Sequence, residues 1–404
     1  MGAQPQGVSW PKDGAVSPDL VGDGSVPLVA YVHVPFCTVR CGYCDFNTYT
    51  KDFGPGASLA TYADSVVQEI SLSKKVLEDA GLPLRTLNSV FFGGGTPSLM
   101  APEAIAKILD ALRGAYGLAD GAEVTLEMNP ETATATKIQG FKQAGVNRLS
   151  IGMQSASQRV LNVLDRAHDP AKVHGTLDMA RSAGLSTSLD LIYGAPTETI
   201  EEWQQTLQQA VKLAPDHLSV YSLIVEPGTK MAAQIRRGQL PETDPDLDAD
   251  KYRLADRILG QAGYDWYELS NFATTPQDRS VHNLAYWKNW DWWGFGPGAH
   301  SHLGDLRWWN VKHPLAYAGR LQAGDSPGFQ GETLSAEDRH VETVMLGIRT
   351  RQGLPVQIGS PEAHDRLLGD GLVDPLCYQQ GKLVLTLNGR LLADHVTRVL
   401  LDWE

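Results

Sequence analysis

Cys37-Thr38-Val39-Arg40-Cys41-Gly42-Tyr43-Cys44 holds three of the four cysteines in this 404-residue chain. It follows the apolar run YVHVPF at residues 31–36, which has the pattern of a buried strand. Three thiols on a loop after a strand can form a disulfide, hold zinc or hold an iron–sulfur cluster. An odd number argues against a disulfide framework, and zinc would need a fourth ligand, such as His33 or a distant residue. A closed [4Fe–4S] site takes four cysteines, so three would leave one iron open to a substrate or cofactor.

The composition is that of an acidic protein without a broad surface for nucleic acid. Asp and Glu number 47 against 34 Lys and Arg, a net charge of −13 at pH 7, and such a chain repels a phosphate backbone. The first 26 residues lack the apolar core and basic start of a signal peptide, so we expect a flexible tail. The sequence has no run of 18 apolar residues, so no transmembrane helix is expected. Clustered, reduced cysteines favour the cytoplasm, and peripheral contact with a membrane stays open.

From residue 28 onward, short apolar runs alternate with amphipathic helical patterns. Strands are expected at residues 28–34, 89–92, 123–127, 147–151, 186–192 and 217–223. Helices are expected at residues 59–80, 102–113, 134–144, 170–183 and 198–213. Alternation of this kind predicts an α/β protein with a parallel sheet and right-handed crossovers. Because six units are too few for a closed eight-unit barrel, we expect a curved, incomplete (β/α)6 barrel.

The pattern changes at the acidic, proline-rich stretch GQLPETDPDLDAD, residues 238–250. Six of the ten tryptophans then lie between residues 287 and 309, which requires either a large aromatic core or a flat ligand. Helical patterns at 336–349 and 390–401 flank a short strand at 382–386, as in a small winged-helix-like module. We therefore predict four parts: a flexible N-terminal tail (1–27), the barrel (28–237), a connecting segment (238–310) and a mainly helical C-terminal domain (311–404).

Polar residues stand at the ends of several predicted strands, where a parallel barrel places its binding site. The stretch GGGTP at residues 93–97 follows the second strand, and its glycines let the backbone approach a ligand closely. Glu127 ends the third strand, Gln154 follows the fourth and Asp190 lies in the fifth. Each alone is as well explained as an ordinary capping or surface residue. Their common position at one rim predicts a binding site there.

Taken in order, the cysteine stretch, GGGTP, LEMNP, SIGMQS, Asp165-Arg166 and SLDLIYG resemble the oxygen-independent coproporphyrinogen III oxidase-like family of radical S-adenosylmethionine (SAM) proteins. The resemblance covers residues 28–400 and implies that Cys37, Cys41 and Cys44 hold a [4Fe–4S] cluster whose open iron binds SAM. It also implies a set of residues around SAM: Tyr31, Tyr43, Gly94, Gly95, Thr96, Glu127, Gln154, Arg166 and Asp190. Carboxylates would accept from the ribose hydroxyls and the amino group, and Arg166 can pair with a carboxylate in a bidentate manner.

The family contains both oxidases and chaperones, and one position separates them. Oxidase members, which decarboxylate coproporphyrinogen, carry a further cysteine two residues after the third ligand. This chain has Phe46 there, within Cys44-Asp45-Phe46. In this respect it resembles the HemW-type heme chaperones, in which the sequence CDF stands at the same point.

The resemblance also implies a role for the tryptophan-rich stretch. His282-Asn283-Leu284-Ala285-Tyr286-Trp287 matches the H-N-x-x-Y-W motif associated with heme binding in the chaperones, and imidazole is a common axial ligand of heme iron. Neighbouring aromatic rings would cover the porphyrin faces. The alternative is that His282 is a packed or capping histidine. His300, His302 and His313 are rivals for the ligand role, while Cys377 is expected to be a small buried apolar residue.

Three functions are therefore carried forward. The first is a cytoplasmic heme chaperone with a SAM-ligated [4Fe–4S] cluster, which binds heme near His282 and transfers it to an acceptor hemoprotein, for example of the respiratory chain. The second is an oxygen-independent coproporphyrinogen III oxidase. Phe46 is the feature that distinguishes the first function from the second. The third is a zinc-loop binding module. The acceptor, the fate of SAM, the mode of heme attachment and the oligomeric state stay open.

Overall fold

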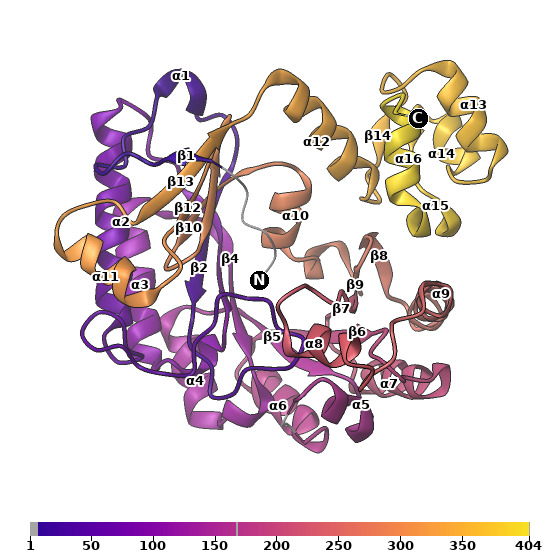
Figure 1. Ribbon diagram of the computed structural model, residues 1–404, viewed down its shortest axis with the longest axis horizontal. Coiled ribbons are helices and arrows are strands. Elements are labelled where there is room, and N and C mark those ends of the chain that lie inside the picture. The colour runs from indigo at the N-terminus through magenta and orange to yellow at the C-terminus, as the bar shows by residue number, and fades with distance from the viewer. Residues whose placement is uncertain (1–6, 167–168, 404) are drawn as a thin grey trace.

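A curved sheet with helices on its outer face forms the body of the molecule (Figure 1). The computed structural model describes residues 7–166 and 169–403. Seven of the strands described there are parallel neighbours, in the order β10-β2-β3-β4-β5-β6-β7. Their bounds are β2 (Leu28–Val34), β3 (Leu87–Gly94), β4 (Leu118–Met128), β5 (Arg148–Gln154), β6 (Ser186–Tyr193), β7 (His217–Ser222) and β10 (Asp291–Phe295). The six predicted strands are β2–β7, so the expected incomplete (β/α)6 architecture is confirmed.

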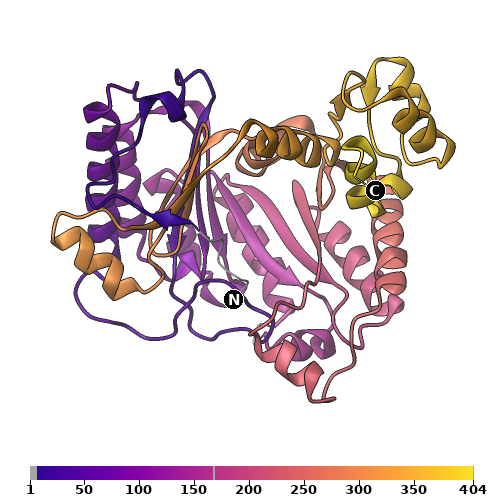
Figure 2. The same ribbon diagram turned by 45° about the horizontal axis from the view of Figure 1, so that its top comes forward.

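The helices between these strands lie on the convex side of the sheet (Figures 1 and 2). Their bounds are α2 (Tyr62–Asp79), α3 (Pro102–Ala115), α4 (Ala135–Ala144), α5 (Gln158–Val163), α6 (Ala171–Ser182) and α7 (Ile200–Leu213), with 3-10 turns η1 (Pro97–Leu99) and η2 (Pro130–Thr132). A further helix after β7, α8 (Lys230–Arg236), contacts the cysteine loop through Met231 and Gly42. Local sequence explains the ends of several helices. A capping box between Thr199 and Glu202 begins α7, and Gly145 ends α4 with a φ of 113° that favours glycine.

Antiparallel strands extend both edges of the parallel sheet. Beside β7 lie β9 (Asn271–Ala273) and β8 (Asp265–Glu268), and beyond β10 lie β11 (His300–Leu303), β12 (Leu306–Asn310), β13 (Gly328–Thr333) and β1 (Val8–Ser9). The segment 238–310, expected to be a connection, thus carries five strands of the sheet as well as α9 (Pro245–Gln261), η3 (Pro276–Asp278) and α10 (Val281–Trp287). Residues 311–335 add α11 (Pro314–Gln322) and β13. This arrangement depends on the pairing of β10 with β2. No local pattern in the sequence predicts that pairing.

Residues 7–27 also differ from the flexible tail that was expected. Strand β1 pairs with β13, α1 (Pro18–Val21) follows, and Trp10 stacks on Trp308 with ring centroids 4.9 Å apart. An aromatic ring of this size buries enough apolar surface to hold a polar segment in place. The expectation was wrong because the partner of Trp10 lies almost 300 residues away in the sequence. Residues 1–6 of the predicted tail lie outside the described residues.

Three of the six tryptophans in the tryptophan-rich stretch belong to an aromatic core. Trp293, Trp308 and Trp309 are buried, and the rings of Trp293 and Trp308 meet edge to face, 5.0 Å apart. Of the two explanations left open for this stretch, the structure supports the aromatic core for these three rings. Trp287 is not part of this cluster and lies at the end of α10.

A mainly helical module completes the chain and has a hydrophobic core of its own. It is yellow in Figure 1 and lies near α9, at the β8 edge of the sheet. Its elements are α12 (Ala336–Ile348), α13 (Pro361–Gly369), α14 (Pro375–Gln379), α15 (Leu387–Leu391), α16 (Ala393–Leu400) and a small sheet of β14 (Leu354–Pro355) and β15 (Lys382–Leu383). Cys377 lies on α14 and is partly exposed, not buried as expected. No helix in the described part of the chain is both long and apolar enough to cross a membrane.

Candidate functional site

The three clustered cysteines lie on a loop that leaves the end of β2 and is tied to the outer helices. Gly42 donates its N–H to the carbonyl of Leu164 (3.3 Å), and its own carbonyl accepts from the N–H of Met231 (2.9 Å). A Cβ on Gly42 would lie 2.3 Å from Oδ2 of Asp165, so a larger residue here would have to displace that carboxylate. The thiols of the loop are free and partly exposed. The loop therefore presents its sulfurs while its backbone is held in place.

A cavity of about 420 Å³ opens beside this loop, at the carboxyl ends of the central strands, and reaches inward to Arg148 and His217, the first residues of β5 and β7. Its wall contains all the residues predicted for the cluster, SAM and heme, namely Tyr31, Cys37, Cys41, Tyr43, Cys44, Gly94, Gly95, Thr96, Glu127, Gln154, Arg166, Asp190 and His282. His300, His302 and His313 are absent from the wall. The fold thus brings together residues that run from β2 to α10 in the sequence.

Two partly buried carboxyl groups, Glu127 on β4 and Asp190 on β6, line the cavity. Oε2 of Glu127 accepts from the N–H of Gly94 (3.0 Å), and both oxygens of Asp190 accept from Oγ of Ser150 (3.0 and 2.9 Å). Burial, followed by the charge of Asp190, raises the pKa of Glu127 to about 8. Burial also raises the pKa of Asp190. Carboxyl groups with raised pKa values in a cavity are typical of ligand-binding sites.

Arg166 brings a fixed positive charge to the cavity wall. It belongs to the segment that follows α5. Its Nη2 donates to Oδ1 of Asn129 (2.6 Å), and its Nη1 donates to Sγ of Cys41 (3.5 Å). Gly152 makes room for it, since a Cβ there would lie 2.9 Å from Nη2 of Arg166. Sequence reasoning did not select Asn129, although it belongs to the quoted LEMNP motif. Only the fold places its amide beside the guanidinium.

The chemistry of the three thiols fits an iron–sulfur cluster. Burial raises the pKa of Cys37 to about 11 and also raises that of Cys44, and metal ligands of this type bind as thiolates. Oγ1 of Thr96 donates to Sγ of Cys37 (3.6 Å), and donors of this kind tune iron–sulfur ligands. In the described ranges, no three His, Cys, Asp or Glu side chains converge on one metal position. A cluster spreads its ligands over several irons and fits this arrangement better than a single zinc ion, which needs four ligands about 2.0–2.3 Å away.

Gln154 ends β5 in a strained conformation. Its φ is 62°, in the left-handed region that non-glycine residues rarely adopt, and the register of β5 against β6 shifts between Gly152 and Gln154. Such strain costs on the order of 1–3 kcal/mol and concentrates at binding sites. The strained backbone of Gln154 in the cavity wall therefore favours a ligand-binding role for this residue.

His282 lies on α10 with its ring in the wall of the cavity. The ring is buried and stacks on Phe91, with ring centroids 5.0 Å apart. Both ring nitrogens are occupied: Nδ1 is 2.8 Å from Oγ of Ser89 and Nε2 is 2.9 Å from Oη of Tyr286. Burial lowers the pKa of His282 to about 3, so the imidazole is neutral. A neutral imidazole can ligate iron, but the iron would first have to displace the Tyr286 hydroxyl from Nε2.

The rival histidines have other partners. His300 stacks on Trp309 at 5.5 Å between ring centroids, and Nε2 of His302 is 2.7 Å from the carbonyl oxygen of Gly304. His313 precedes α11 and accepts from the N–H of Leu315 through Nδ1 (3.2 Å). Each is explained by its place in the fold.

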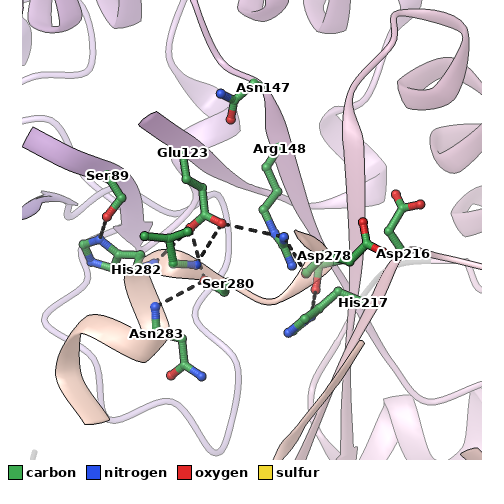
Figure 3. A network of polar contacts seen from close by, with 12 residues as sticks. Ser89, Glu123, Asn147, Arg148, Asp216, His217, Asp278, Ser280, His282 and Asn283 are labelled. Atoms are coloured by element: carbon green, nitrogen blue, oxygen red, sulfur yellow. Dashed lines mark hydrogen bonds and ion pairs between the residues drawn. The ribbon is translucent and has the colours of Figure 1, made fainter. Parts of the chain in front are cut away.

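Glu123 anchors the start of α10 to the barrel (Figure 3). Its carboxylate accepts from the N–H groups of Val281 (3.0 Å) and His282 (3.1 Å) and from Oγ of Ser280 (3.2 Å). These N–H groups open a helix and lack partners within it. Arg148 lies on the other side of the carboxylate, with an N–O distance of 3.6 Å. Sequence reasoning missed Glu123 because it is 157 residues from Ser280.

Replacing Glu123 by glutamine is expected to lower the free energy of unfolding by about 2 kcal/mol, because buried hydrogen bonds to a charged acceptor contribute about 1.5–3 kcal/mol each. The amide keeps one acceptor but loses the charge that faces Arg148. Urea unfolding measures the change. The exposed Glu103, in the first turn of α3, gives a matched control, and equal stability of E123Q and E103Q would contradict the anchoring role.

Residues 31–210 match the radical SAM superfamily. Over 379 residues the chain is 44% identical to the heme chaperone HemW of Mycobacterium tuberculosis (strain CDC 1551 / Oshkosh), covering 93% of this chain and 95% of that protein. The chain belongs to the HemW family of radical SAM proteins.

Two further comparisons agree with this family. The mitochondrial radical S-adenosyl methionine domain-containing protein 1 of Mus musculus is 36% identical over 349 residues, covering 86% of this chain and 73% of that protein. Among solved structures, the coproporphyrinogen III oxidase HemN from Escherichia coli matches with a TM-score of 0.79 at 25% identity, covering 97% of this chain and 96% of that one. This chain and the HemN chain therefore share one architecture along almost their whole length.

Membership of the radical SAM superfamily sets aside one of the three functions considered. The radical SAM superfamily implies SAM and a [4Fe–4S] cluster, and the thiols and their donors fit that cluster, so the zinc-loop alternative is set aside. Phe46 lies at the cavity wall with 55% of its surface exposed. An apolar ring thus stands where the oxidase members are expected to carry a further cysteine.

Proposed function

We propose that this protein is a heme chaperone, which binds heme and transfers it to an acceptor hemoprotein in the cytoplasm or, peripherally, at the respiratory chain. The 44% identity to a heme chaperone over 95% of its length carries the proposal. Phe46, in place of a further cysteine, supports a chaperone over an oxidase.

The cavity residues have separate tasks in this proposal. Cys37, Cys41 and Cys44 would hold the [4Fe–4S] cluster, and SAM would lie against Tyr31, Tyr43, Gly94, Gly95, Thr96, Glu127, Gln154, Arg166 and Asp190. When bound, the cluster and SAM supply one-electron chemistry. The guanidinium of Arg166 is suited to a carboxylate, and Glu127 and Asp190 are suited to hydroxyl and ammonium groups.

The affinity for SAM is expected to rise with pH through about 8, the value to which burial raises the pKa of Glu127. Below this pH the carboxyl group is protonated and neutral, and above it the carboxylate attracts the positively charged SAM. A gain of roughly tenfold from pH 6.5 to pH 8.5 is expected, because one pKa unit corresponds to a tenfold change. Calorimetric titration of the anaerobically reconstituted protein measures it. In E127Q the gain should disappear, whereas a profile parallel to that of the parent would contradict the role of Glu127.

The function itself is tested by titrating the reconstituted protein with heme, followed by absorption in the Soret region. Saturable binding is expected, and the loaded protein should then pass heme to an added apo-hemoprotein. A protein that binds no heme, or that converts coproporphyrinogen III anaerobically to protoporphyrinogen, would overturn the proposal. The second result would identify an oxidase.

A further inference from the structure

Helix α10 lies between two cavities. His282, Asn283 and Tyr286 line the cavity already described, whereas Leu284, Trp287 and the following Lys288 line a second cavity of about 590 Å³. Its opposite wall is formed by α12 and the turn at residues 350–354, at the start of the C-terminal module. Figure 1 shows α12, the first helix of that module, above α10. The H-N-x-x-Y-W motif therefore contributes to two separate spaces.

The second cavity is cationic, although the chain carries a net charge of −13. Arg279, Lys288 and Arg351 line it, and no Asp or Glu is among its lining residues in the described chain. Arg351 also pairs with Asp265 across 3.0 Å, where both side chains are largely exposed. The guanidinium of Arg279 lies over the ring of Tyr267, 5.8 Å from its centroid. This concentration of positive charge favours a ligand with carboxylates.

The remaining wall offers apolar surface. Leu284, Trp287 and Leu346 are half-buried there, and Leu354 is buried. Asn289 adds two further observations: its φ is 52°, and its buried Oδ1 has no hydrogen-bond partner among the described residues. Backbone strain and an unsatisfied polar atom together are typical of ligand sites. The cavity therefore combines apolar surface, positive charge and an unsatisfied amide.

We infer that this second cavity binds the cargo porphyrin, whose apolar macrocycle would pack on Trp287, Leu284 and Leu346 and whose two propionates would pair with Lys288, Arg351 and Arg279. The inference rests on the proposed function and refines its site. The cavity volume lies within the range of about 300–1,000 Å³ that is typical of small-molecule pockets. No His, Cys or Met lines the described cavity. Binding here depends on the porphyrin faces and propionates and not on an axial iron ligand.

The test measures fluorescence quenching and absorption on titration of the full-length reconstituted protein with three probes: heme, metal-free protoporphyrin IX and heme dimethyl ester. The parent is expected to bind heme and protoporphyrin IX with similar affinity and the ester about tenfold or more weakly, since each lost charge pair changes affinity by up to a factor of ten. The double variant K288E/R351E is expected to bind both free acids about tenfold more weakly. K75E, at an exposed position of α2, is the charge-reversal control. Unchanged far-ultraviolet circular dichroism and cluster content show that the variants fold.

The binding results distinguish the second cavity from other porphyrin sites. Parent-like binding by folded K288E/R351E overturns the second cavity as the cargo site. So does binding that requires iron and disappears in H282A, although the proposed chaperone function then stands with His282 as the ligand. If the parent binds neither heme nor protoporphyrin IX, both the site and the proposed function fail. Weaker binding by K288E/R351E, with K75E and H282A close to the parent, supports the site.

Discussion

Replacing Lys251 by alanine is expected to lower the free energy of unfolding by about 3–5 kcal/mol, the cost of breaking a buried ion pair by removing one partner. Nζ of Lys251, on α9, lies 3.0 Å from Oε2 of Glu198 just before α7, and the two side chains are 1% and 0% exposed. The N–H of Gly194 also donates to Glu198 (2.8 Å). Without the ammonium group, the carboxylate stays buried with no cation in contact.

The pH dependence of this loss follows from the same contact. Burial raises the pKa of Glu198 and Lys251 opposes the rise, so the pKa rises further in K251A. A carboxyl group with a raised pKa destabilises the folded protein most above that pKa, and the penalty disappears as the pH falls through it. The deficit of K251A should therefore be larger at pH 8 than at pH 5.5, as measured by urea unfolding.

Arg253 on the same helix gives a matched control. It pairs with Asp250 across 2.9 Å, but both side chains are about half-exposed, and exposed pairs contribute about 0.2–1 kcal/mol. K251A should therefore be several times more destabilised than R253A. Similar unfolding of the two variants would mean that the buried pair does not hold α9 against α7.

Replacing Cys41 by alanine is expected to abolish loading of the [4Fe–4S] cluster. The cluster has three cysteine ligands where a closed site has four, and the variant would leave only two. Iron and sulfide analysis after anaerobic reconstitution, together with the absorption of the cluster, measures this directly. Cys41 also receives the hydrogen bond from Nη1 of Arg166, so its loss removes a donor–sulfur contact as well as a ligand.

Cys377 provides the control for this experiment. It lies on α14 of the C-terminal module and does not line the cavity. The variant C377A should therefore load iron and sulfide like the parent. Loss of the cluster in C377A, or full loading in C41A, would contradict the assignment of Cys37, Cys41 and Cys44 as the ligands.

Local patterns accounted for much of the fold and the first cavity. Apolar runs and helical periodicity predicted β2–β7 and their helices, because burial of one face leaves a repeat in the sequence. The residues expected at the strand ends meet in one cavity, because the carboxyl ends of parallel strands lie at one rim. Family motifs supplied Tyr43, Arg166 and His282, whose positions no periodicity reveals.

What the sequence by itself determined about this protein is the identity of its short-range elements and the spacing of its three thiols, since both depend on neighbouring residues. The tertiary structure alone decided that β10 pairs with β2, that Trp10 holds the N-terminal segment to Trp308, and that Glu123 anchors α10. It also decided that α10 faces two cavities. These features depend on contacts between segments far apart in the chain, whose free energy is gained only when the whole sheet has formed.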